Sequence, residues 1–102
     1  PLGQADAYKV FGRISGLKNA WDLAEELLDE SERLQREHGS RLGEAEVEEV
    51  RGWLHERRQN YDEAMEAYQR AMMIFHEMKA MGGAKRVRDA ILHLQETTAD
   101  KK

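Results

Sequence analysis

The sequence of 102 residues contains no cysteine, which excludes disulfides, thiolate nucleophiles and thiolate zinc sites. It has one proline and eight glycines, so long stretches without helix breakers favour helices over a β fold with many turns. It also lacks a run of about 18 apolar residues and a charged-then-apolar leader, so we expect no membrane span and no secretory signal. Because cysteine-free chains suit reducing compartments, we expect a cytoplasmic location.

The net charge of −4 is unevenly distributed along the chain. Residues 20–50 carry 11 acidic and 3 basic side chains, a local charge of −8, whereas residues 51–90 carry 6 acidic and 8 basic side chains, a local charge of +2. An acidic middle segment repels phosphate, so nucleic acid is not an expected partner. Most of the charges are expected on solvated helix faces, in i,i+4 pairs such as Glu32 with Arg36.

Apolar residues recur at an interval of 40 residues. The three sets are Ala7, Val10 and Ile14, then Val47, Val50 and Leu54, then Val87, Ala90 and Leu94. The same step relates Gly12 to Gly52, Trp21 to Tyr61, Ala24 to Ala64, and Leu28 to Tyr68. Self-similarity of this length is typical of a stacked solenoid, in which each unit buries its apolar face against a neighbour. The repeat therefore predicts a surface that holds another macromolecule.

The apolar spacing predicts five helices, over residues 5–15, 20–38, 44–58, 60–81 and 84–97. Gly39 is a candidate C-cap for the second helix, and Gly82 with Gly83 is expected to end the fourth. Asn60 is a candidate N-cap for the fourth helix, because Glu63 stands at the capping-box position. The polar tail after Thr97 is expected to fray.

Two helices have patterns that predict how they are covered. The first has one apolar face with Val10 and Ile14 and a second with Phe11, so it is expected to be covered on both sides. The third carries Glu48 and Arg51 where large apolar residues would be expected, which predicts a solvent-exposed face. Among the five methionines, most have core spacing, and Met73 is the one most expected to be exposed.

Two stretches resemble the tetratricopeptide repeat (TPR) family. The first comprises Tyr8, Phe11, Gly12, Trp21, Ala24, Leu28 and Ser31, and the second comprises Gly52, Tyr61, Ala64, Tyr68 and Ala71. The 40-residue step is similar to that of the extended variants of the family. The resemblance implies that small residues lie where paired antiparallel helices cross, so that Gly12 would approach Ala24 and Gly52 would approach Ala64.

The resemblance implies an all-α fold of antiparallel helix–turn–helix repeats, stacked as a short right-handed α-solenoid of about two and a half units. The expected division is a tag remnant at 1–3, a first repeat at 4–43, a second at 44–83, a capping helix or the start of a third repeat at 84–97, and a frayed tail at 98–102. A plain helical bundle is the alternative.

The resemblance also implies a concave groove lined by the first helix of each unit. The expected partner-binding residues are Lys9, Arg13, Glu46, Glu49, Trp53, Arg57, Arg86 and His93. Trp53 lies off the inward apolar stripe, so it is either a binding anchor or a residue that packs on a neighbouring helix. Some family members grip the C-terminal carboxylate of heat-shock chaperones, but Glu49 would repel that ligand.

The sequence gives little support for catalysis. The four histidines lack the i,i+4 spacing of metal ligands, and each is expected to be exposed. No phosphate-binding glycine loop and no calcium-binding loop is present. We therefore expect a protein that is not an enzyme and that needs no cofactor and no metal.

The expected function is a protein–protein interaction module that binds a peptide or helix of a partner in its groove, as a fragment of a scaffold, adaptor or regulatory protein. The alternative is a self-association or regulatory helical domain of a transcriptional or signalling protein. Two and a half units are fewer than the three that solenoids usually need. Either the chain is cut from a longer array or its open repeat faces pair in a homodimer.

Overall fold

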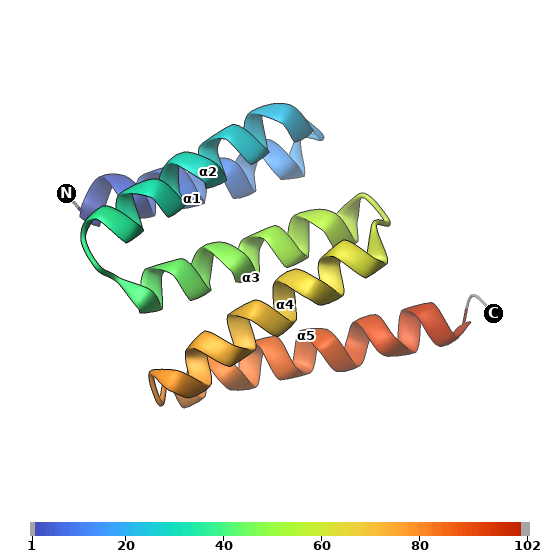
Figure 1. Cartoon of the computed structure of the whole chain (residues 1–102). Helices are drawn as coiled ribbons and strands as arrows, with labels where there is room; N and C mark the ends of the chain where they lie inside the picture. The colour runs from blue at the N-terminus through green and yellow to red at the C-terminus, as the bar shows by residue number, and fades with distance from the viewer. Residues whose placement is uncertain (1, 101–102) are drawn as a thin grey trace.

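A computed structural model describes the backbone of residues 2–100 and the side chains of residues 3–99. Five α-helices follow one another along the chain (Figure 1). They are α1 (Leu2–Leu17), α2 (Trp21–Glu37), α3 (Arg41–Arg57), α4 (Tyr61–Glu77) and α5 (Met81–Asp100). Within residues 2–100 there is no strand. The prediction of an all-α fold of stacked antiparallel helix–turn–helix units is confirmed.

The four connections between helices share one geometry. The middle residue of each three-residue turn has a left-handed φ: 62° at Asn19, 67° at Gly39, 63° at Gln59 and 56° at Lys79. The next amide donates to a carbonyl five residues back, as from Ser40 to Gln35 at 2.8 Å. This arrangement satisfies carbonyls at the helix C-terminus. A new helix therefore begins every 20 residues, and two helices make the 40-residue repeat.

Several predicted boundaries are wrong by a few residues. The fourth helix ends at Glu77, and Gly82 and Gly83 lie in the first turn of α5. Lys79 makes the turn instead, although lysine is not a residue that signals a left-handed conformation. The expected repeat boundaries at 43/44 and 83/84 consequently fall inside α3 and α5.

The chain ends also differ from expectation. Leu2 and Gly3, assigned to a tag remnant, belong to α1, whereas Pro1 lies outside the described residues. The last helix continues past Thr97 to Asp100. Lys101 and Lys102, at the end of the expected frayed tail, lie outside the described residues. Asn60 is the N-cap of α4, but its side chain makes no capping hydrogen bond.

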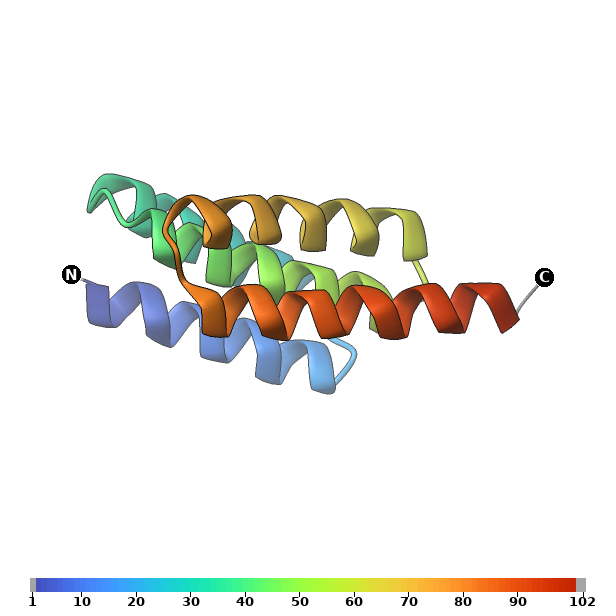
Figure 2. The same cartoon turned by 90° about the horizontal axis from the view of Figure 1, so that it is seen from below.

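The helix α3 lies at the centre of the molecule and contacts the other four helices. Seen from below, α1 and α5 lie on one side and α2 and α4 on the other, with α3 between them (Figure 2). One apolar cluster joins α3 to α2, through Ala24, Leu28, Val47, Val50 and Leu54. A second joins α3 to α4 and α5 around Tyr68, Phe75, Val87 and Leu94. Successive interfaces of this kind belong to a repeat stack, so the alternative of a plain bundle is wrong.

Glycines permit close helix crossings, at Ala24 as expected for Gly12, but at Tyr68 and not at Ala64 for Gly52. A Cβ atom at Gly12 would lie 3.3 Å from the Ala24 carbonyl oxygen and 3.1 Å from Leu28. A Cβ atom at Gly52 would lie 2.6 Å from the ring of Tyr68. In both hairpins the missing side chain makes room for a large residue of the second helix.

The helix α1 is covered on one side only, contrary to the prediction. Ser15 and Ala5 are buried, and the Ser31 hydroxyl donates to the Ala5 carbonyl at 2.7 Å. The opposite face is exposed, with accessible fractions of 50% at Val10, 54% at Phe11, 42% at Ile14 and 56% at Leu17. No described helix packs on this face, because α1 is the first helix of the stack.

Candidate functional site

The helices α1 and α5 lie on the same side of α3 (Figure 2), and side chains of all three helices line a hollow there. It contains a pocket of about 160 Å³ lined by Lys9, Arg13, Glu46, Glu49, Val50 and Arg86. All of these except Val50 are predicted groove residues, and the structure brings them together from three helices. Pockets for drug-sized ligands measure about 300–1,000 Å³, so this pocket suits a single side chain of a larger ligand.

The carboxylates of the hollow are engaged by cations from the flanking helices. Lys9 of α1 donates to Glu46 at 3.3 Å. Arg86 of α5 donates twice to Glu49, at 3.0 Å from Nε and 3.1 Å from Nη2. This bidentate bond raises the pKa of Arg86. The two ion pairs connect α1 and α5 to the same stretch of α3.

Trp53 lies in the same hollow and is both a packing residue and a groove residue. It is half-buried against the cluster of Leu28, Val50 and Leu54, and it also lies against Gly16, where a Cβ atom would be 3.0 Å from its ring. Two exposed guanidinium groups stack on it, with Cζ 5.0 Å from the ring centroid for Arg13 and 5.4 Å for Arg57. Cation–π attraction holds each of the two arginines at the Trp53 ring.

Tyr68 is a residue of the site that sequence reasoning missed. Its ring crosses α3 at Gly52, and its hydroxyl donates to Glu56 at 3.0 Å. Burial, and then the neighbouring Glu56 carboxylate, raise the pKa of Tyr68 above its ordinary value. The predicted groove residue His93 is exposed on α5, 3.9 Å from Glu56. The repeat, which relates Gly52 to Gly12 and Tyr68 to Leu28, was the available signal, but it does not reveal where the Tyr68 hydroxyl points.

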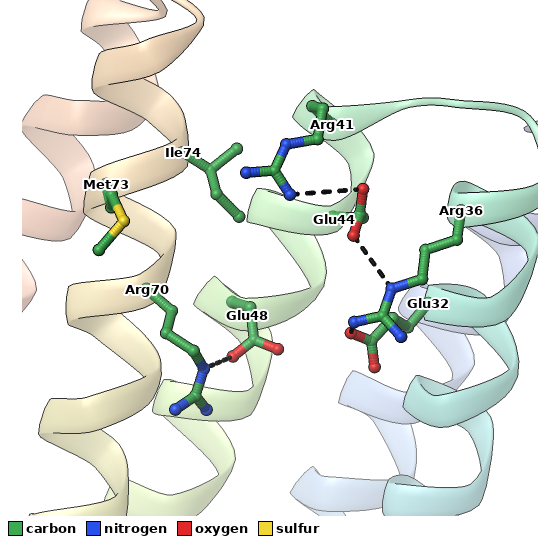
Figure 3. Close-up of a pocket in the computed structure, with 8 residues that line it drawn as sticks. All are labelled: Glu32, Arg36, Arg41, Glu44, Glu48, Arg70, Met73 and Ile74. Carbon is green, nitrogen blue, oxygen red and sulfur yellow. Dashed lines mark hydrogen bonds and ion pairs between the residues drawn. The ribbon is translucent and has the colours of Figure 1, made fainter.

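A second hollow, of about 240 Å³, lies between α2, α3 and α4 and is lined mostly by residues that pair with one another. Figure 3 shows Glu44 between Arg41 and Arg36, at 3.7 Å and 3.1 Å. Arg36 also reaches Glu32 at 2.7 Å, and Arg70 of α4 reaches Glu48 of α3 at 2.9 Å. Because each of these charges has a partner, the hollow joins α2, α3 and α4 and offers no unpaired group to a ligand.

The predicted solvent-exposed face around Glu48 and Arg51 is wrong. Glu48 is buried, and the Arg51 side chain is only 17% exposed. Arg51 lies 2.8 Å from both Glu48 and Glu32 and 2.6 Å from Asp29. Burial alone would lower the pKa of Arg51, but its hydrogen bonds to Glu32 and Glu48 outweigh that effect and raise it. Charged residues occupy this helix interface because each is paired across it.

The described residues contain no group of three histidine or carboxylate side chains placed to hold a metal ion. His38, His76 and His93 are exposed as predicted, but His55 is half-buried. Met73 is exposed as predicted, but Met78 and Met81 are exposed too, so the core spacing expected for most of the five methionines is wrong. None of the described helices combines the length and the apolar character needed to cross a membrane.

Neither a known protein-family model, nor a curated protein, nor a solved structure matches this chain. Its class is therefore defined by the fold alone, as an all-α stack of helix hairpins with a charged, tryptophan-containing hollow on one side.

Proposed function

We propose that the chain is a protein–protein interaction module that binds a peptide or helix of a partner in the hollow of α1, α3 and α5. The observation that carries the proposal is Trp53, a half-buried aromatic with two arginines stacked on it, beside a pocket lined by three helices. Aromatic and arginine side chains dominate the binding energy of protein interfaces. Such modules act within scaffold, adaptor or regulatory proteins.

The proposal includes a TPR-like assignment of the repeats. It is supported by the 40-residue hairpin unit and by the glycine crossings at Gly12 and Gly52. It is also supported by the placement of all eight expected groove residues on α1, α3 and α5. Under this proposal the chain acts by binding and not by catalysis, it needs no cofactor, and its setting is cytoplasmic.

The test begins with a peptide-display library, from which the full chain selects the peptides that it binds. The affinities of these peptides for the chain are then measured by fluorescence anisotropy. Trp53→Ala is expected to weaken binding at least about tenfold, because the anchor is lost. The double variant Lys9→Glu/Arg13→Glu is also expected to weaken it. Trp21→Ala is the matched control, since Trp21 stacks with Arg58 outside the hollow. Unchanged affinity in both groove variants would contradict the proposal.

A second candidate function is self-association through the exposed face of α1. Val10 and Ile14 stand 40 residues before Val50 and Leu54, which are buried against the preceding hairpin. The fold therefore buries this stripe wherever another unit precedes it. Two copies of α1 crossing antiparallel about Gly12 would bring Val10 of one copy to the level of Ile14 of the other. The proposed occupant of this face is thus a second copy of the chain.

A further inference from the structure

Two cations in the hollow have no anionic partner. Three arginines, Arg13, Arg57 and Arg88, form no ion pair with any residue that the structure describes. Two of these three, Arg13 and Arg57, meet on the ring of Trp53 although they come from different helices. The Trp53 cluster, defined as Arg13, Trp53 and Arg57, therefore gathers positive charge at one place.

The carboxylates nearest to the cluster do not neutralise it. Glu46 and Glu49 are engaged by Lys9 and Arg86. The third carboxylate of the hollow, Glu56, accepts the hydrogen bond of the uncharged Tyr68 hydroxyl at 3.0 Å and lies 3.9 Å from His93, so it keeps its negative charge when His93 is neutral. Four cations, Lys9, Arg13, Arg57 and Arg86, therefore stand against three carboxylates, Glu46, Glu49 and Glu56, and these groups together keep a net charge of +1. Neither Arg13 nor Arg57 donates a side-chain hydrogen bond to another described residue. The cluster thus presents two guanidinium groups whose N–H donors are unused by the described residues.

We infer that the Trp53 cluster binds an anionic side chain of the partner peptide. This inference rests on the proposed function, because the cluster lies in the proposed peptide groove. Planar guanidinium groups recognise carboxylate and phosphate oxygens through paired N–H donors, so aspartate, glutamate and phosphoserine share the required chemistry. The exposed part of the Trp53 ring receives an apolar neighbour of that side chain.

The partner is a peptide and not a polyanion. Residues 20–50, which include most of α2 and α3, carry a net charge of −8 and would repel a ligand with negative charge along its whole length. A peptide with one acidic residue between apolar ones carries negative charge at a single place, which the cluster can receive. The cluster therefore selects acidic-apolar segments of proteins.

The test uses three short fluorescein-labelled peptides and the full chain. The first carries one glutamate between leucines in an otherwise uncharged sequence, the second replaces this glutamate by glutamine, and the third replaces it by phosphoserine. We expect the glutamate peptide to bind at least about tenfold more tightly than the glutamine peptide at low salt, with the difference shrinking as salt rises. The phosphoserine peptide distinguishes the source of the anion, because tighter binding than that of the glutamate peptide identifies phosphate as the preferred group.

The variants Arg13→Gln and Arg57→Gln test whether the preference for the glutamate peptide arises at the Trp53 cluster. Each is expected to reduce the preference for the glutamate peptide over the glutamine peptide at least about threefold. Arg58→Gln is the matched control, because Arg58 also stacks on a tryptophan, Trp21, but has Glu25 as its ion partner at 3.5 Å. Circular dichroism confirms that each variant folds.

The outcomes separate this inference from the proposed function. Equal affinity for the glutamate and glutamine peptides, with Trp53→Ala weakening both, would overturn the inference and leave the peptide groove standing. A preference for glutamate that Arg58→Gln removes and Arg13→Gln does not would also overturn it. If none of the three peptides binds, and if display selects no peptide whose binding depends on Trp53, both the inference and the proposed function fail.

Discussion

Single residues set the distance between paired helices in this stack. The recurrence of Gly12 at Gly52 was visible in the sequence, because a glycine inside a helix costs stability and so indicates a packing reason. The ion pairs of Glu48 and Arg51 were not predictable, since their partners come from helices whose register only the packed structure defines. Charged residues at an interface and charged residues in solvent give the same local pattern.

Replacement of Gly52 by alanine tests the close crossing of α3 and α4. The new methyl group would lie 2.6 Å from the ring of Tyr68, so Gly52→Ala is expected to lower the free energy of unfolding by about 1–3 kcal/mol. Gly82→Ala is the control, because nothing lies within 4 Å of a Cβ atom at Gly82. This second change is expected to be neutral or to stabilise by up to about 1 kcal/mol. Urea unfolding measures both, and a Gly52→Ala variant as stable as the parent would contradict the crossing.

Because the pKa of Tyr68 is raised, the stability of the fold is expected to fall at alkaline pH. Because the folded chain holds the Tyr68 proton more tightly than the unfolded chain does, stability is complete below pH 10 and falls as the pH rises above about 10. Unfolding by urea from pH 8 to pH 11 is expected to show this fall. Tyr68→Phe should make the decline in stability shallower. An unchanged decline in that variant would show that other titrating groups cause it.

At the scale of whole helices, the sequence predicted the number and order of the elements better than their ends. Periodic apolar residues identify a helix over its full length, but an end depends on one or two turn residues. Gly39 gave such a signal, whereas Gln59 and Lys79 adopt the same left-handed conformation without one. Tertiary packing of both flanking helices imposes the turn at these positions.

The turns themselves can be tested by exchanging their residues. Gly39→Ala places a side chain at a φ of 67° and is expected to destabilise the fold by about 1 kcal/mol. Lys79→Gly removes a side chain at a φ of 56° and is expected to leave stability unchanged or to increase it slightly. Thermal unfolding compares the two variants. A stabilising Gly39→Ala change would show that this turn does not keep its left-handed geometry.

The last helix differs from α1 and α3 at one informative position. Leu92 stands 40 residues after Gly52, where a glycine allows α4 to cross α3. Its exposed side chain would obstruct a further helix that packed in the same way. Of the two predicted roles for the final helix, a capping helix or the start of a third repeat, Leu92 favours the capping helix.

On the scale of the whole molecule, the helices form a flat slab of 45 × 33 × 16 Å with the hollow on one side and the bare face of α1 at one edge. The repeat predicted the stack of helix hairpins, but it left open whether Trp53 lines the groove or packs on a neighbouring helix. It could not predict that Arg13 and Arg57 share the ring of Trp53, because this contact depends on the angle between α1 and α3.

The exposed apolar face of α1, which includes Val10 and Ile14, gives a prediction about the oligomeric state of the chain. If two copies pair through this face, light scattering after size exclusion is expected to show a dimer that dissociates on dilution. Val10→Lys/Ile14→Lys should then give a monomer, because charged groups would be buried in the interface. Met73→Lys on α4 is the control, since Met73 is exposed but lies away from α1. A monomer at all concentrations in the parent chain would contradict self-association.

Binding of a peptide in the hollow of α1, α3 and α5 is tested most directly by NMR. A peptide selected by display is added to the isotopically labelled chain, and the chemical-shift changes are mapped on the structure. We expect the largest changes on the inner side of α1, α3 and α5, including the indole N–H of Trp53, with little change on α2. Changes concentrated on α2 and α4, with the Trp53 signal unmoved, would contradict it.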